Sequence, residues 1–186
     1  MNDHLELNNA FIIPTTNWIK KVVIDCNFCP FAAKALAKKS VRYVVTETTD
    51  FKTALTTLAN EFEFLNNNKN IETTFIIFSE GFSKFLQYLN LVDKSERLLT
   101  KENYEGIYQL ASFHPQYLFA GSDENDAANY TNRSPYPMLH LLREDSITKA
   151  LENFDDPDGI PEKNIDFAKT KGLAYMKILA ASCILK

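Results

Sequence analysis

The stretch VRYVVTETTDFKTALTTLANEFEFLNNNKNIETTFIIFS, residues 41–79, contains in succession the patterns of a strand, a helix and a second strand, and this order indicates the architecture of the domain. Residues 41–48 and 73–79 are rich in β-branched and aromatic residues, which are typical of strands. Between them, apolar residues recur on one helix face, as in Phe51, Leu55, Leu58 and Phe62, and Asp50 can cap that helix. A helical crossover joins parallel strands, so the stretch predicts a parallel β-α-β unit.

The flanking sequence extends this unit into one domain spanning residues 1–186. It predicts two more strands, at 106–114 and 138–142, and helices near 15–24, 30–39, 82–99 and 147–153. The last two strands form a long-looped hairpin or another edge arrangement. We expect residues 1–14 to be partly disordered and 160–186 to form a terminal helix, bent at Gly172. The predicted class is α/β (or α+β), with a four-stranded, mostly mixed sheet covered by helices.

Composition and charge narrow the functional classes. With 45% hydrophobic residues, the chain is ordinary for a globular domain. The net charge of −4 argues against a broad nucleic-acid surface, which is usually basic. The N-terminus has no signal-peptide pattern, and the apolar runs are too short to span a bilayer. We therefore expect a cytoplasmic protein with neither membrane nor nucleic acid as partner, its oligomeric state left open.

The long polar insert at residues 115–137 is the first candidate for a site, because loops longer than about 15 residues are uncommon unless functional. His114 precedes it and His140 follows it, so paired strands would bring both histidines together. The insert and its flanks also hold Asp126, Asn129, Asn132, Arg133, Ser134, Tyr136 and Arg143. Asn, Asp and Ser are also ordinary turn formers, and His140 between two leucines can equally be a core residue.

Cys29 is the second candidate. It stands directly before Pro30, which suits the first position of a helix, where free N–H groups would favour a thiolate. The same cysteine can instead be buried and inert. Cys26 and Cys29 form a C-x-x-C pair that, with His114 and His140, could supply four zinc ligands, but no spacing rule supports that set. We therefore expect no zinc site from this set and assign no metal ligand.

Four runs carry a resemblance to the domain of unknown function 1415 family: SFHP at 112–115, FAG at 119–121, DAANYTNRSPYP at 126–137 and LHLLRE at 139–144. Trp18 and residues 27–32 match the N-terminal motif, so the resemblance covers nearly the whole chain. It implies that motif positions are held by Cys29, His114, Asp126, Asn129, Asn132, Arg133, Ser134, Tyr136, His140 and Arg143. At Cys26 the chain departs from the motif, which has an apolar residue there, and this weakens the C-x-x-C idea. The resemblance implies no reaction or cofactor.

Three functional hypotheses follow. In the first, an enzyme acts on a small anionic molecule that Arg133 and Arg143 hold. His114 or His140 would be the general acid or base, Asp126 would orient a histidine, and Cys29 would be a nucleophile. Asn27, Asn129, Asn132, Ser134 and Tyr136 would bind the ligand.

In the second hypothesis the protein binds a metal or small ligand without catalysis. In the third, four aromatic residues form an interaction face: Tyr117, Phe119, Tyr130 and Tyr136. The first hypothesis carries a geometric expectation, namely that the Cys29 corner, the His114 strand end and the 129–136 loop meet in one pocket.

Overall fold

The core of the protein is a four-stranded mixed sheet, which the computed structural model describes within residues 2–152 and 156–184. Its strands are β1 (Val41–Thr46), β2 (Thr73–Phe78), β3 (Tyr108–Phe113) and β4 (Met138–Arg143), in the order β1-β2-β4-β3. β1 and β2 are parallel, and β4 is antiparallel to both of its neighbours. The predicted α/β class, mixed sheet and parallel β-α-β unit are confirmed.

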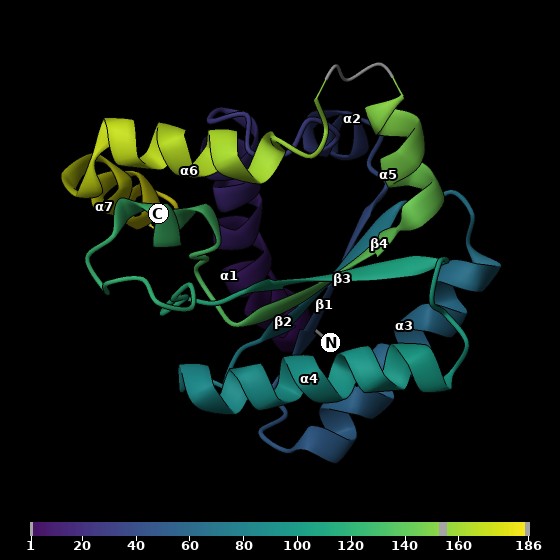
Figure 1. Ribbon diagram of the computed structural model, residues 1–186. Helices are drawn as coiled ribbons and strands as arrows, with labels where there is room; N and C mark the ends of the chain where they lie inside the picture. Colours follow the sequence, from purple (N-terminus) through teal and green to yellow (C-terminus); the bar gives the residue numbers. More distant parts are fainter. Residues whose placement is uncertain (1, 153–155, 185–186) are drawn as a thin grey trace.

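Two helices cover one face of the sheet, α3 (Phe51–Asn67) and α4 (Phe85–Lys101), which lie below it in Figure 1. Asp50 caps α3 as predicted, since its Oδ1 accepts a hydrogen bond of 2.9 Å from the backbone N–H of Thr53. The apolar stripe of α3 packs on inward side chains such as Ile76 and Leu141, forming one of two hydrophobic clusters.

The other face of the sheet carries the remaining helices (Figure 1): α1 (Asn2–Trp18), the π-helix η1 (Ile19–Ile24), α2 (Ala32–Ala37), α5 (Glu144–Leu151), α6 (Ile160–Lys171) and α7 (Leu173–Ser182). The sequence pattern predicts that the first helix begins near residue 15, but α1 begins at Asn2. The helix is longer because Phe11 and Ile12 also pack on the second hydrophobic cluster, around Trp18 and Phe75. The terminal segment forms two helices that meet at Gly172, whose φ of +81° interrupts the helical backbone.

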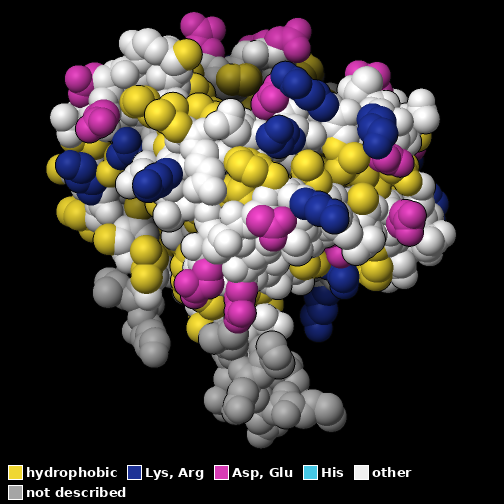
Figure 2. Space-filling view, turned by 90° about the horizontal axis from the view of Figure 1, so that it is seen from below, with side chains coloured by type: hydrophobic (Ala, Val, Ile, Leu, Met, Phe, Trp, Pro, Cys, Tyr) yellow, Lys and Arg dark blue, Asp and Glu magenta, His cyan; other side chains and the backbone are white. Residues whose placement is uncertain are grey.

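The surface over α3 and α4 is of mixed character. Figure 2 shows Lys and Arg side chains interspersed with Asp, Glu and apolar side chains on this face, without a large area of one sign. Within the described residues, no helix combines the length and the hydropathy needed to cross a bilayer.

Candidate functional site

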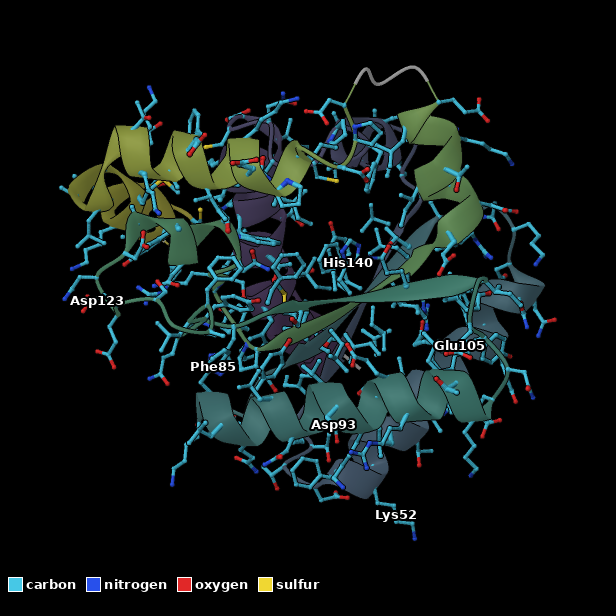
Figure 3. The ribbon with its side chains drawn as sticks, viewed as in Figure 1. Lys52, Phe85, Asp93, Glu105, Asp123 and His140 are labelled. Carbon is cyan, nitrogen blue, oxygen red and sulfur yellow. The ribbon has the colours of Figure 1, made fainter. Side chains whose placement is uncertain are left out.

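A cavity of about 890 Å³ lies over the sheet face that is turned away from α3 and α4. Its floor is formed by β2, β4 and β3, and its walls come from η1, α2, α5 and the start of α6. Figure 3 shows His140 on this side of the sheet, directed toward the space below the upper helices. It exceeds the cavity of about 470 Å³ between α4 and β3 and is lined mainly by apolar side chains, which makes it the candidate site.

The centre of the floor is a row of three residues in register. Phe75 of β2 and Ala111 of β3 are the direct cross-strand neighbours of His140 on β4, so all three side chains share one face of the sheet. The Phe75 and His140 rings stack with their centroids 3.8 Å apart and an angle of 8° between their planes. On the other side of His140, Ala111 contributes only a methyl group and leaves the cavity open.

His140 is half-buried and neutral. Its Nε2 lies 2.5 Å from the hydroxyl oxygen of the buried Thr73. Burial lowers the pKa of His140 to about 3, because the charged imidazolium would lose its hydration. Near neutral pH the ring is therefore a hydrogen-bonding group, and its basicity is too low for the general base that the sequence predicts.

Cys29 also lines the cavity, but as a protonated thiol. α2 begins only at Ala32, with Phe31 at the N-cap, so Cys29 precedes the helix by more than one residue. Burial raises the pKa of Cys29 to about 11, which outweighs the lowering effect of the backbone N–H groups of Phe31 and Ala32. The expected thiolate is wrong for this reason.

His114 lies outside the cavity, on the opposite side of the sheet. It is fully buried against Phe85 and Tyr88, the ring centroids lying 5.2 and 5.0 Å away. Its Nε2 donates to the carbonyl oxygen of Phe82 at 3.0 Å, and its Nδ1 accepts from the backbone N–H of Gln116 at 2.9 Å. Nε2 thus holds the end of β3 to the loop before α4, and Nδ1 stabilises the turn that follows β3.

The polar side chains of the 115–137 insert bind mainly to its own backbone. Asn129 is buried and bridges the loop, accepting from the N–H of Phe119 at 3.0 Å and donating to the carbonyl of Asp123 at 2.8 Å.

Asp126 caps the short 3₁₀ helix η2 (Ala127–Thr131) through the N–H of Ala128 at 2.9 Å. Ser134 donates to the carbonyl of Tyr136 at 2.6 Å, and Asn132 donates to the carbonyl of Ser112 at 3.4 Å.

Arg133 has the same kind of role. Its Nε donates to the carbonyl of Tyr117 at 3.1 Å, its Nη2 donates to that of Glu124 at 3.0 Å, and the guanidinium lies 4.6 Å from the centre of the Tyr130 ring. Tyr136 packs edge-on against Phe11, with centroids 4.9 Å apart. The insert therefore fastens the helical layer to the sheet, away from the cavity.

Two further predicted features lie apart from the cavity. Asn27 is exposed in the turn after η1, where its φ of +57° is a conformation that asparagine tolerates. The aromatic face expected of the insert is not exposed, because Tyr130 is buried and Tyr117, Phe119 and Tyr136 are half-buried. Of the expected single pocket, the cavity contains the Cys29 corner, whereas His114 and the 129–136 loop lie outside it.

Arg143 borders the cavity, yet its guanidinium is occupied by the end of α3. Nη2 donates to the carbonyl oxygens of Leu65 and Asn68, Nε donates to that of Ile71 at 3.0 Å, and Nη1 lies 3.3 Å from the hydroxyl of Tyr108. These contacts add a charged donor to the carbonyls of Leu65 and Asn68, which also accept backbone N–H groups, and pair the carbonyl of Ile71 in the turn after α3. The predicted role in holding an anion is therefore replaced by a structural one.

We expect Arg143→Met to lower the free energy of unfolding by about 2–3 kcal/mol, since it removes the guanidinium donor from three backbone carbonyls, of which that of Ile71 has no other donor among the described residues. Urea denaturation followed by circular dichroism measures this. Arg97→Met is the matched control, because Arg97 forms only an exposed ion pair with Asp93 at 3.1 Å and should cost less than about 0.5 kcal/mol. Equal losses in the two variants would contradict the assigned role.

The opening of the cavity carries four lysines that the sequence does not single out: Lys34, Lys38, Lys69 and Lys149. Two acidic residues, Glu72 and Asp145, lie among them. Lys38 approaches Glu72 at 3.9 Å, whereas the other three lysines form no ion pair with any described residue. These lysines come from α2, the α3–β2 turn and α5, so no local motif could reveal them.

Comparison with known proteins identifies a family whose model matches most of the chain. The model of the family described as "Protein of unknown function (DUF1415)" matches residues 10–178 of the 186 in the chain. No curated protein and no solved structure matches the chain. Among the described residues, no group of three or more His, Cys, Asp or Glu side chains is arranged to hold a metal ion.

Proposed function

The chain belongs to the DUF1415 family of proteins of unknown function, and from its cavity we propose that it binds a small organic anion with a large apolar part. The observation that carries the proposal is a cavity of about 890 Å³ with an apolar interior and lysines at its opening. Ligand pockets for small molecules typically measure about 300–1,000 Å³ and combine apolar walls with a few polar groups.

The interior suits an apolar body. Aromatic and aliphatic side chains from distant parts of the chain meet there, including Trp18, Phe28, Phe113, Leu142, Ile147 and Ile160. Transfer of apolar ligand surface from water into such a space is favourable by about 25 cal/mol per Å². An apolar ligand would thus gain most of its binding free energy from the walls.

The opening suits an anionic end. Its four lysines outnumber its two acidic residues, although the whole chain has a net charge of −4. A local excess of positive charge on an acidic protein attracts anions selectively to that place. A carboxylate, sulfonate or phosphate at the opening would be the counterpart of Lys34, Lys69 and Lys149 while the apolar part fills the interior.

Binding is favoured over catalysis by the state of the polar groups in the cavity. Burial holds Cys29 as a thiol, with a pKa of about 11, and His140 as a neutral ring, with a pKa of about 3. A nucleophile and its base need the reverse shifts near neutral pH. The hypothesis of an enzyme for a small anionic molecule thus keeps its ligand class, but Cys29 and His140 are unsuited to the roles of nucleophile and general base.

Anilinonaphthalene sulfonate, a fluorescent anion with an apolar ring system, tests the proposal. We expect it to bind with enhanced fluorescence and to be displaced by dodecanoate. Replacing Lys34, Lys69 and Lys149 together by Gln should weaken the binding of dodecanoate about tenfold, since each exposed charge contributes about 0.3–1 kcal/mol.

A matched control removes the same charge elsewhere. Lys52, Lys94 and Lys101 are exposed on α3 and α4, and Figure 3 shows Lys52 at the far side of the molecule from His140. Their triple replacement by Gln should leave the affinity for dodecanoate within about twofold of the unmodified protein. Equal weakening by the two triple variants would contradict the lysine-lined opening.

A further inference from the structure

The hydrogen bonds around Thr73 determine the tautomer of His140. The Thr73 hydroxyl oxygen lies 2.6 Å from the carbonyl oxygen of Leu141 and 2.5 Å from Nε2 of His140. A hydroxyl has one hydrogen, and a carbonyl can only accept, so that hydrogen goes to Leu141. The hydroxyl oxygen must then accept from His140, which places the imidazole hydrogen on Nε2 and leaves a bare lone pair on Nδ1.

The packing around the ring holds this arrangement. Phe75 stacks on one face of the imidazole, and the Phe113 ring lies 6.1 Å away at an angle of 40°. Nδ1 receives no hydrogen bond from the side chains and backbone that the structure describes around it. Because His140 lines the cavity and the neighbouring Ala111 is small, there is room for a ligand atom beside the ring.

We propose that Nδ1 of His140 is the polar recognition point inside the cavity and accepts a hydrogen bond from a hydroxyl or amide N–H of the ligand. The inference rests on the proposed function and makes it more specific. The ligand is then an organic acid with two polar ends: an anionic group at the lysines and a neutral hydrogen-bond donor at the floor, separated by an apolar middle.

The physical reason is the asymmetry of buried hydrogen bonds. A ligand with only a methyl group at the floor would displace water from Nδ1 without donating a hydrogen bond to it. The acceptor would then be buried and unsatisfied, which is unfavourable. A ligand with a donor at that point satisfies it. Sites of this kind reject the analogue that lacks the donor, because their own polar group is then left unpaired.

The tautomer can be measured without any ligand. Long-range ¹H–¹⁵N correlation spectra distinguish a nitrogen that carries hydrogen from one that does not, and the chain has only three histidines. We expect the His140 signals, identified by their loss in His140→Phe, to show a protonated Nε2 and a bare Nδ1. Thr73→Ser should preserve both the pattern and the Nε2 resonance, whereas Thr73→Val, which removes the hydroxyl that accepts from Nε2–H, should move the Nε2 resonance. A protonated Nδ1 in the unmodified protein would overturn the inference.

Ligand preference provides the second test. ω-Hydroxydodecanoate and tridecanoate have the same length and differ in a terminal hydroxyl or methyl. The preference for the hydroxy acid, expressed as the ratio of the two dissociation constants, should fall about tenfold in His140→Phe. In the unmodified protein the hydroxy acid, and not tridecanoate, should shift the Nδ1 resonance, so the test stands even where the variant does not fold.

The outcomes separate the two proposals. If neither acid binds, the proposed function fails and the inference fails with it. A second outcome is that both acids bind, that the ratio of their dissociation constants is unchanged in His140→Phe, and that neither acid shifts the Nδ1 resonance. In that case the proposed function stands and only the role of His140 is overturned.

Discussion

Lowering the pH from about 7.5 to about 5 is expected to reduce the free energy of unfolding by about 2 kcal/mol through His140 alone. Burial lowers the pKa of His140 to about 3, against an ordinary value of 6.5. In the folded protein the ring stays neutral, whereas in the unfolded chain it binds a proton below about pH 6.5. The stability due to the neutral ring is thus complete above about pH 6.5 and declines from there toward about pH 3, at about 1.4 kcal/mol per pH unit.

His114 adds to this loss in the same direction. Its burial also lowers its pKa below 6.5, and the hydrogen bonds to the backbone around Phe82 only partly oppose that effect. The two histidines lie on opposite faces of the sheet, so their contributions should be nearly additive.

Urea denaturation at a series of pH values between about 5 and 7.5 measures the slope. In His140→Gln the slope between about pH 5 and 6 should fall by about 1.2 kcal/mol per pH unit, because glutamine does not titrate. His114→Gln should remove its own share, and the double variant should be nearly flat in this range. An unmodified protein whose stability is constant between these pH values would show that neither histidine is held neutral by the fold.

Much of the fold could be predicted because it depends on local patterns. The stretch at 41–79 contains two apolar strands and a capped amphipathic helix, and the structure pairs those strands in parallel. The position of β4 between β2 and β3 could not be predicted in this way. It depends on which strand edge is free when the chain returns, and that is a property of the assembled sheet.

The register of the last two strands explains the misplaced histidine. Of the two arrangements that the sequence leaves open for the last two strands, the structure has the long-looped hairpin: β3 and β4 pair, and Ala111 is the direct partner of His140. Side chains alternate between the two faces along a strand, so His114, three residues after Ala111, is on the opposite side from His140. A sequence that does not reveal the register cannot decide between convergence and separation.

The polar residues of the insert suggested a ligand-binding site from the sequence, and the reason is chemical. Asparagine, aspartate, serine and arginine can bind a ligand or a loop backbone with the same groups, and only the geometry distinguishes the two uses. Here Asn129 and Arg133 donate to backbone carbonyls of their own loop. The cavity, by contrast, depends on an alanine and on scattered lysines, which carry no pattern in the sequence.

Ala111→Phe is expected to abolish binding in the cavity, with at least about a hundredfold loss of affinity for dodecanoate. The Cβ of Ala111 lies beside His140 on the cavity floor, so a benzyl group would occupy the space that we assign to the ligand. It would do so without removing a hydrogen bond or a charge. Since it fills empty apolar space, the free energy of unfolding should stay within about 1 kcal/mol of the original value.

Isothermal titration calorimetry of Ala111→Phe with dodecanoate shows whether the ligand occupies the cavity. Leu86→Phe is the control. Leu86 is 77% exposed on α4, so this substitution introduces the same aromatic side chain on the opposite side of the sheet, away from the cavity. We expect the control to bind as the unmodified protein does and Ala111→Phe to release no measurable heat of binding. Unchanged affinity in a folded Ala111→Phe protein would show that the ligand does not occupy the cavity.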